Sequence, residues 1–369
     1  MLREHFEAIT DKRQPGKVRH NLLEMIVMTI CAVIAGCDVW EDIADYCRVK
    51  EGWFKESLGM RLENGIPSHD TLARVFSLIN PAEFERCFSS WVASVCQKTE
   101  GEIISIDGKT ARGSASKGKN PLHMVSAWAH EQQLVLGQVA TDVKSNEITA
   151  VPELLNILDI QGCIVTADAM SCQKQITQKI IDGGGDYVLG LKDNQRTLKR
   201  DAQDYFEAAL ADRNLYPELA HFHTTDRGHG RVEVRDYYLT TSIDWLYGKE
   251  SWHGLRGLGM VRAKVTEGEK TTEDTRLFIT SLLNVGAFAR AARAHWGIEN
   301  SLHWCLDMTF REDASRIRKD HSAENFEVVR HISLNILKQY PAKMSLARKR
   351  RRCSYDDVFL AGVLGFVRA

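Results

Sequence analysis

Two aspartates in this chain each follow a short apolar segment of the kind that forms a buried strand. Asp107 comes after residues 103–106, and Asp168 comes after residues 163–167. A carboxylate at the carboxyl end of a buried strand faces the crevice where α/β sheets bind their ligands. Two such carboxylates on adjacent strands repel each other unless a cation lies between them. The pattern therefore predicts a cation site, to which Glu299 in an expected helix is a third candidate contributor.

The donor set of this predicted site consists of carboxylate oxygens, which favour Mg²⁺ or Mn²⁺ over zinc. Two such ions about 3.5–4 Å apart can activate an attacking oxygen and stabilise a leaving oxygen in phosphoryl transfer. On this interpretation Asp107, Asp168 and Glu299 would be catalytic residues that bind two Mg²⁺ or Mn²⁺ ions per active site. Each also has an ordinary interpretation, because an aspartate suits the turn after a strand and a glutamate suits a solvated helix face.

The expected helix at residues 286–306 offers a different metal chemistry. Residues four positions apart share one face of a helix. The side chains on this face that can bind metals are His295, Glu299, His303 and Asp307. Two histidines and a carboxylate can bind zinc, so a zinc-dependent hydrolase is an alternative in which the two aspartates have no role. Glu312 and Asp313, just beyond the helix, are an alternative source of the third carboxylate.

The elements that must position these residues follow from the spacing of apolar residues. Residues 1–98 have apolar residues at helical spacing and no strand pattern. From residue 101 the pattern predicts three strands, with a turn at 130–133 between the last two, and then alternating helices and strands up to residue 191. Residues 211–282 are again strand-like, whereas 286–306 and 321–340 are helical. This order predicts an α/β fold with a mixed sheet, preceded by an all-α domain.

Composition narrows the class of protein. Hydrophobic residues make up 44% and charged residues 26% of the 369 residues, which are ordinary globular values. The absence of an apolar run of about 18 residues excludes a predicted membrane span. The nine cysteines form no Cys-x-x-Cys pair, which is typical of reduced cysteines in a cytoplasmic protein. The net charge of −1 argues mildly against a nucleic-acid partner, but residues 309–352 carry 12 basic and five acidic residues.

One segment resembles a known family closely. Residues 106–114 read Ile-Asp-Gly-Lys-Thr-Ala-Arg-Gly-Ser, which is similar to the first-aspartate motif of the H-repeat-associated insertion-sequence transposases. Further blocks that resemble this family, in the same order, are residues 144–148, 166–174, 187–195 and 295–304. The resemblance extends over nearly the whole chain, including Gly65 to Thr71 in the helical part. Several long blocks in one order make the resemblance specific.

The resemblance implies a DNA transposase with a ribonuclease-H-like catalytic core and an Asp-Asp-Glu triad. It assigns the triad to Asp107, Asp168 and Glu299, and it implies that the β-rich residues 211–282 are an insertion before the glutamate helix. This sequence departs from the wider superfamily in one respect. The superfamily has a Tyr seven residues before its glutamate, an Arg four residues before it and a Lys seven residues after it. The residues here at the corresponding positions are Ala292, His295 and Leu306. The DNA contacts usually assigned to that signature therefore cannot be carried over.

The sequence predicts that the chain has three parts. Residues 1–98 are a helical domain that binds DNA or forms a dimer, residues 99–340 are the catalytic domain, and residues 341–369 are a basic C-terminal segment. The expected partners are the terminal repeats of the element and the target DNA, with a homodimer forming during synapsis. The expected location is the bacterial cytoplasm, in association with the nucleoid and without a membrane.

Basic and histidine side chains in this chain are the candidate DNA contacts, because cationic groups hold phosphates. The candidates are Lys109, Arg112, Arg231, Arg235, His295, His303 and Arg350. His295 and His303 could instead support the neighbouring Glu299, or be ordinary packed or surface residues of the helix. Arg350 belongs to the run Arg348–Arg352, which would add salt-sensitive affinity or would form a solvated tail. A catalytically inactive DNA-binding remnant of a transposase is the alternative to an active enzyme.

Overall fold

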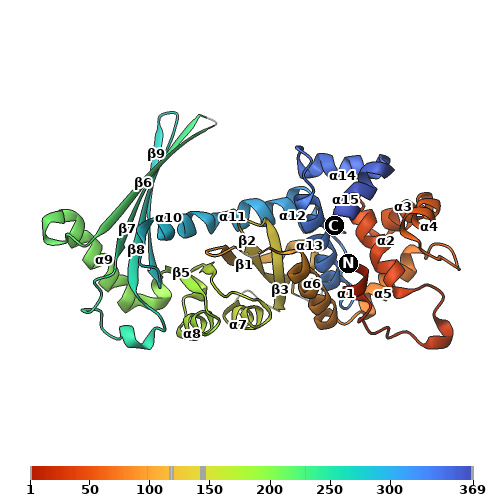
Figure 1. Ribbon diagram of the computed structural model, residues 1–369, viewed down its shortest axis with the longest axis horizontal. Coiled ribbons are helices and arrows are strands. Elements are labelled where there is room, and N and C mark those ends of the chain that lie inside the picture. The colour runs from red at the N-terminus through yellow and green to blue at the C-terminus, as the bar shows by residue number, and fades with distance from the viewer. Residues whose placement is uncertain are drawn as a thin grey trace.

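The computed structural model describes residues 2–97, 99–115, 118, 120–141, 147–228 and 230–366. It confirms the mixed α/β class, with a nine-stranded sheet in the order β3-β2-β1-β4-β5-β9-β8-β7-β6. Figure 1 shows an elongated molecule with helices at one end, the strands β1–β5 in the middle and long hairpins at the other end. Residues 144–146, the start of one motif that resembles the transposase family, lie outside the described residues.

The N-terminal part is helical, as predicted. Its helices are α1 (Leu2–Phe6), α2 (Leu22–Ile34), α3 (Trp40–Val49), α4 (Glu51–Leu58), α5 (His69–Leu78) and α6 (Pro81–Val95). Three of them begin at polar caps, because the side chains of Asn21, Ser68 and Asn80 accept hydrogen bonds from backbone amides of the first turn. Pro81 follows Asn80 at the first helical position, where its missing amide hydrogen costs nothing.

The middle of the molecule contains the strands that position the two aspartates. They are β1 (Ile103–Ala111), β2 (Leu122–Ala129), β3 (Leu134–Thr141), β4 (Ile164–Ala167) and β5 (Asp186–Leu191). The first three pair in antiparallel fashion, whereas β4 is parallel to both β1 and β5. Helices α7 (Glu147–Ile157) and α8 (Lys174–Asp182) lie below these strands in Figure 1. The predicted order of a hairpin-rich start followed by alternating elements is confirmed.

The predicted β-rich segment follows α9 (Arg196–Ala211). Its strands are β6 (Ala220–Gly228), β7 (Arg231–Thr240), β8 (Gly257–Glu267) and β9 (Lys270–Thr280). β9 pairs with β5, so these strands extend the central sheet rather than forming a separate one. Strand β6 escaped individual prediction because its residues are exposed or half-buried along the whole strand, which gives no clear alternation of apolar and polar residues.

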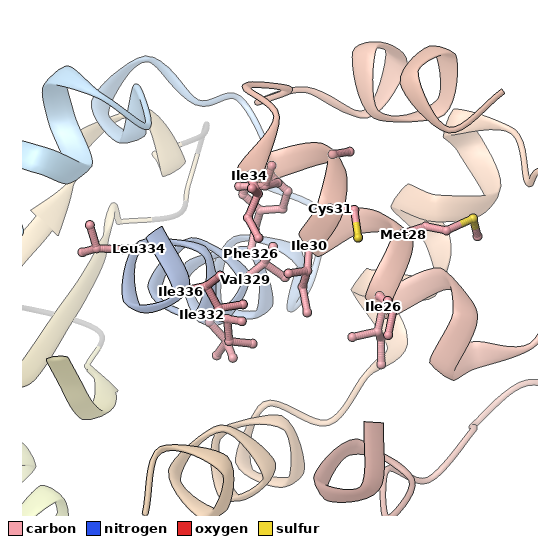
Figure 2. Packing of buried hydrophobic residues seen from close by; sticks show 14 of the residues in the cluster. Ile26, Met28, Ile30, Cys31, Ile34, Phe326, Val329, Ile332, Leu334 and Ile336 are labelled. Carbon is pink, nitrogen blue, oxygen red and sulfur yellow. The ribbon is translucent and has the colours of Figure 1, made fainter. Parts of the chain in front are cut away.

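Helix α13 (Ser322–Gln339) lies at the centre of the helical end. Its apolar residues Phe326, Val329 and Ile332 pack toward α2, as Figure 2 shows. Two buried amides connect it to other elements: Asn325 donates to the carbonyls of Phe76 and Ile79 in and after α5, and Asn335 exchanges two hydrogen bonds with the backbone of Val135 in β3. One core therefore joins the helical end to the sheet.

The last helices, α14 (Leu346–Tyr355) and α15 (Asp357–Phe366), belong to this same core. Cys353, Leu360 and Val363 are buried in the cluster that also contains the apolar residues of α2. The packing thus places apolar residues of 346–366 in one buried cluster with those of the N-terminal helices. Charge alone gave no indication that this basic segment covers apolar surface.

Two expectations from composition can be compared with the structure directly. In the described part of the chain, no helix is both long enough and apolar enough to span a membrane. All nine cysteines are in the described part of the chain, where none is assigned to a disulfide and most are buried.

Candidate active site

Asp107 and Asp168 occupy equivalent positions on two adjacent parallel strands. The pairing of β1 with β4 ends at Ile106 opposite Ala167, so the two aspartates are the next residue on each strand. The prediction that Asp107 ends its strand is wrong, because β1 continues to Ala111 in pairing with β2 alone. Asp168 does follow its strand. Both aspartates therefore lie where the pairing of β1 with β4 ends.

Asp168 also has a structural role. Its Oδ1 atom accepts hydrogen bonds from the backbone amides of Met170 at 2.9 Å and Ser171 at 3.3 Å. These bonds cap a short 3-10 turn, Ala169–Ser171, immediately after the strand. The ordinary turn interpretation is thus correct for Asp168, and the capping contacts fix the orientation of its carboxylate next to β1.

The helix that carries Glu299 is interrupted by a π-helical turn. The structure divides it into α10 (Val285–Ala294), α11 (Trp296–Ile298), the π turn Glu299–His303 and α12 (Trp304–Met308). Figure 1 shows these pieces as one line that runs from the long hairpins past β1 and β2 to the helical end. A π turn is rare and is found most often at functional sites. Glu299 is its first residue and is exposed.

A chain of hydrogen bonds connects this helix to the two catalytic strands. Thr166 in β4 donates to the hydroxyl of Ser105 in β1 at 3.0 Å, and its Oγ1 lies 3.1 Å from Nδ1 of His295. Burial lowers the pKa of His295 to about 4, so the imidazole is neutral near pH 7. His295 therefore holds the start of the glutamate turn against the strands and has little surface to offer DNA.

His303, at the other end of the π turn, faces Asp107. Its Nδ1 atom lies 3.6 Å from Oδ2 of the aspartate, and its side chain is 14% exposed. Burial, with smaller contributions from Lys109 and nearby histidines, lowers the pKa of His303 to about 3. The residue that we predicted to contact DNA therefore contacts the candidate catalytic aspartate as a neutral imidazole.

The three carboxylates share one cavity of about 850 Å³. Burial raises the pKa of Asp107 to about 7, opposed by a backbone hydrogen bond from Gly108 and reinforced by the charges of Asp168, Glu147 and Glu299. Among the residues that the structure describes, none of the three predicted triad residues forms an ion pair with a lysine or arginine. The site is consequently partly buried and carries excess negative charge.

Such a site suits a divalent cation by its donor chemistry, because hard carboxylate oxygens without a cationic partner are what Mg²⁺ and Mn²⁺ bind. The side chains are not in closed coordination geometry, however. Within the described ranges, no group of three or more His, Cys, Asp or Glu side chains is already arranged to hold a metal ion. This applies equally to the zinc alternative on the face of His295 and His303, whose first imidazole is hydrogen-bonded to Thr166.

A second cavity, of about 440 Å³, continues from the first toward the long hairpins. Glu299, Trp296 and Arg276 line both cavities, and the guanidinium of Arg276 lies 4.1 Å from the centre of the Trp296 ring. Arg231 and Arg235 on β7 line the second cavity. The strands of the insertion thus provide one wall of a continuous groove that passes Glu299.

The predicted cationic DNA contacts fall into two groups. Arg112 and Arg231 are solvent-exposed, with 83% and 50% of their side chains accessible, although each also lies near an acid, Asp313 at 3.7 Å and Glu233 at 3.4 Å. The others are enclosed and paired within the protein: Lys109 with Asp307, Glu312 and Asp313, Arg235 with Asp226 and Glu233, and Arg350 with Asp38. Arg350 also donates to backbone carbonyls of Val33 and Thr309. Burial in a packed helix explains why the solvated-tail interpretation of Arg350 is wrong.

Two residues near the site were missed at the level of sequence. Glu147 begins α7, is buried, and lies 2.6 Å from Nε2 of His123. Its charge acts on Asp107, and a carboxylate at a helix start just after a strand was the available signal. Arg276 lies in the segment 211–282 that was predicted only as strand-like, although the alternation along β9 could have placed it on the side of the groove.

Comparisons with known proteins agree with the earlier resemblance. The family model described as "Transposase DDE domain" matches residues 98–336, and the one described as "DDE_Tnp_1-associated" matches residues 3–92. The chain is 42% identical to "H repeat-associated putative transposase YhhI" of Escherichia coli (strain K12), over 98% of this chain and 97% of that protein. It is 40% identical to "Putative transposase YncI" of Escherichia coli O157:H7, over 98% of this chain and 94% of that protein.

Among solved structures, the chain is similar to a piggyBac transposase in a synaptic complex with hairpin DNA. The TM-score is 0.44 at 11% sequence identity, and the alignment covers 95% of this chain and 75% of that one.

Proposed function

The chain belongs to the transposase DDE family, and from this premise we propose that it cuts DNA at the ends of an insertion element and joins the freed ends to target DNA. The observation that carries the proposal is the placement of Asp107 and Asp168. Each aspartate comes one residue after the last paired position of two adjacent parallel strands, and both line a cavity together with Glu299. The proposed catalytic residues are these three.

Divalent metal is the proposed cofactor, with Asp107, Asp168 and Glu299 as the residues that would hold two Mg²⁺ or Mn²⁺ ions. When bound, such ions supply Lewis-acid activation of the attacking oxygen and stabilisation of the leaving oxygen. The protein would supply carboxylates whose orientation is fixed. Backbone amides orient Asp168, and His303 contacts Asp107. The pKa of Asp107 is raised by burial first and then by the neighbouring carboxylates, and a bound cation would offset both effects, which supports a cation site.

The proposed path of DNA follows the groove from Asp107 past Glu299 toward the insertion. Exposed Arg231 and the shared lining residue Arg276 are positioned along it to hold phosphates, and exposed Arg112 lies just after β1. A ribonuclease-H-like core is supported by the strand order β3-β2-β1-β4-β5, with three antiparallel strands followed by two parallel ones. Binding to terminal repeats and target DNA, a homodimer during synapsis, and a location in the cytoplasm with the nucleoid belong to this proposal.

The test is a strand-cleavage assay on DNA that carries the terminal repeats of the element, with Mg²⁺ or Mn²⁺ and with a chelator. Wild-type protein should cleave only with the metal. Asp107→Asn and Asp168→Asn, which keep the shape of the side chain, should bind the same DNA and lose cleavage by about 10³-fold or more, since several kcal/mol of stabilisation is removed. Binding by the wild type without cleavage under either metal would overturn the proposal and favour an inactive DNA-binding protein.

A further inference from the structure

The segment that follows Asp107 is bound to the segment that follows the glutamate helix. We call this contact region the β1–η9 seam, after β1 and the 3-10 turn η9 (Glu312–Ala314). It consists of residues 109–113 on one side and 307–318 on the other. Lys109 is at its centre, with Nζ 2.8 Å from Oδ1 of Asp307, 3.7 Å from Oδ1 of Asp313, and in contact with the carboxylate of Glu312. One lysine thus connects β1 to three carboxylates beyond Glu299.

Backbone contacts reinforce the seam. The amide of Arg112 donates to Oδ1 of Asp313 at 3.1 Å, and Nε of Arg318 donates to the carbonyl of Gly113 at 2.7 Å. Gly113 is so close to the opposite segment that a Cβ atom there would lie 2.2 Å from the carbonyl oxygen of Ser315. The two segments are therefore in direct backbone contact, and the glycine is required by that proximity.

Burial makes Lys109 unavailable to an external phosphate. Its side chain is 11% exposed, and that of Glu312 is only 2% exposed. Behind Glu312 lies a second buried pair, Glu327 with Arg330 on α13. Burial and the charge of Glu327 raise the pKa of Glu312, whereas Lys109 and Arg330 oppose this shift. Moving Lys109 toward DNA would leave Glu312 buried without its cation.

The seam lies on the opposite side of Glu299 from the contact made by His295. On the N-terminal side, His295 is hydrogen-bonded to Thr166 of β4. On the C-terminal side, Asp307 on α12 and Glu312 just beyond it are bound to Lys109 of β1. The π turn Glu299–His303 lies between these two attachments. The position of the turn relative to the strands is therefore determined at both of its ends.

We propose that Lys109 is a positioning residue that holds the Glu299 turn in place against Asp107 through Asp307 and Glu312, and that it does not contact DNA. The sequence interpretation had grouped Lys109 with Arg112 as phosphate contacts, but the structure separates them, since Arg112 is exposed and Lys109 is enclosed. The effect on catalysis rests on the proposed function, whereas the effect on the order of residues 299–308 does not.

The experiment compares Lys109→Met with Arg112→Met in the full-length protein. The first readout is amide hydrogen exchange over residues 299–308 without DNA. Lys109→Met should accelerate exchange there by about tenfold or more, which is a change of one logarithmic unit in the opening equilibrium. Arg112→Met should change it much less, because the Arg112 side chain is 83% exposed and lies 3.7 Å from Asp313. Lys109→Arg should recover part of the protection because it keeps the charge. Unchanged exchange in Lys109→Met would overturn the proposal.

The second readout is the dependence of DNA affinity on salt, measured in Ca²⁺ or chelator. A residue that contacts one phosphate contributes about 0.9 to the slope of log affinity against log salt. Arg112→Met should reduce the slope by about this amount, and Lys109→Met should not. A reduced slope in Lys109→Met would identify it as a DNA contact and overturn the proposal. Both readouts are independent of cleavage, so an inactive wild type would count against the proposed function alone.

The third readout is metal-dependent cleavage by Lys109→Met at saturating DNA. It should fall by about tenfold or more with unchanged DNA affinity, and a higher Mn²⁺ concentration should be needed for half-maximal rate. If Lys109→Met fails to fold, Asp307→Asn removes the 2.8 Å pair at a half-buried residue and takes its place. Asp307→Asn should accelerate exchange over residues 299–308 to a smaller extent, and unchanged exchange in that variant would also overturn the proposal.

Discussion

The Nδ1 atom of His303 lies 3.6 Å from Oδ2 of Asp107, across the space between β1 and the π turn. The contact joins the last residue of the turn to the first proposed catalytic carboxylate, while Glu299 stands at the start of the same turn. The spacing of the turn therefore decides how Glu299 and Asp107 face each other. A regular α-helix through these residues would rotate the two side chains differently around the helix axis.

Replacing His303 tests this relationship. His303→Leu should reduce metal-dependent cleavage by about 10–100-fold, the usual cost of losing a group that orients a metal ligand. DNA affinity and its salt dependence should stay unchanged, because the imidazole is largely enclosed. His303→Asn, which keeps a polar atom close to the Nδ1 position, should retain more activity than His303→Leu. Weaker DNA binding with normal cleavage would instead make His303 a DNA contact.

Salt dependence of binding tests whether the exposed Arg231 contacts a phosphate in the groove. Arg231→Met should lower the slope of log affinity against log salt by about one, because the side chain lines the groove and is half exposed. Lys55→Met on α4 is the matched control, since Lys55 is exposed and pairs only within its own helix. An equal change in both variants would show that net charge, rather than a contact in the groove, determines the slope.

Gly108 is predicted to tolerate no side chain. A Cβ atom there would lie 2.3 Å from Oε1 of Glu147 and 2.5 Å from Nε2 of His123. Gly108→Ala should lower the free energy of unfolding by about 1–3 kcal/mol through overpacking, and should also reduce cleavage because the displaced residue adjoins Asp107. Gly52→Ala is the control: it has open space around it and lies in α4, so it should stabilise the protein by about 0.5–1 kcal/mol. Denaturant unfolding measures both.

Arg350 is predicted to stabilise the fold, in contrast to its neighbour Arg351. The guanidinium of Arg350 donates to Asp38 at 2.6 Å and to the carbonyl of Val33 at 2.7 Å, in a buried place where the pKa of Asp38 is raised by burial. Arg350→Met should cost about 3–5 kcal/mol of unfolding free energy, because Asp38 is left buried without its partner. Arg351→Met, at an exposed position, should change it by less than about 0.5 kcal/mol.

Asp107 should make the metal-free protein sensitive to pH. Burial, together with Asp168, Glu147 and Glu299, raises the pKa of its carboxyl to about 7 in the folded state. The folded protein therefore holds this proton more tightly than the unfolded chain does. Its contribution to stability is complete below pH of about 4 and is lost as the pH rises through 7. Asp107→Asn should consequently gain stability relative to wild type between these pH values, by about 1.4 kcal/mol per unit of pKa difference.

Adding Mn²⁺ supplies the complementary measurement at pH 8. A ligand that binds only the folded state at 100 times its dissociation constant stabilises it by about 2.7 kcal/mol. Wild-type protein should show such a gain in thermal unfolding, and Asp107→Asn should lose most of it. An identical gain in both proteins would place the bound metal elsewhere.

The location of the candidate aspartates could be predicted because strand ends are visible in the sequence. Apolar runs with a following carboxylate indicated β1 and β4, and the hairpin between β2 and β3 followed from its turn. The pairing register that places Asp107 and Asp168 side by side could not be predicted, because register depends on contacts between strands. The continuation of β1 beyond Asp107 was missed for the same reason.

The glutamate helix and the cationic residues show a second limit. A helix with a π turn has nearly the same apolar spacing as an unbroken one, so residues 286–306 were predicted as one regular helix. Charge in a sequence also does not indicate burial. Lys109 and Arg350 have the same side-chain chemistry as exposed cations, and only the acids brought near them from residues 307–313 and Asp38 show that they are internal.

The shared core around α13 has a consequence for how the protein is made. Helices α2, α5 and α6 are synthesised first, but their apolar faces pack on α13, and α14 and α15 complete the same core. At roughly 5–20 residues per second, the ribosome needs on the order of ten seconds or more between α6 and α13. During that time the early helices can pack on one another, as Phe6 does on Phe84 and Trp40 on Phe76, but their faces toward α13 stay uncovered. A truncated product would therefore keep an exposed apolar surface.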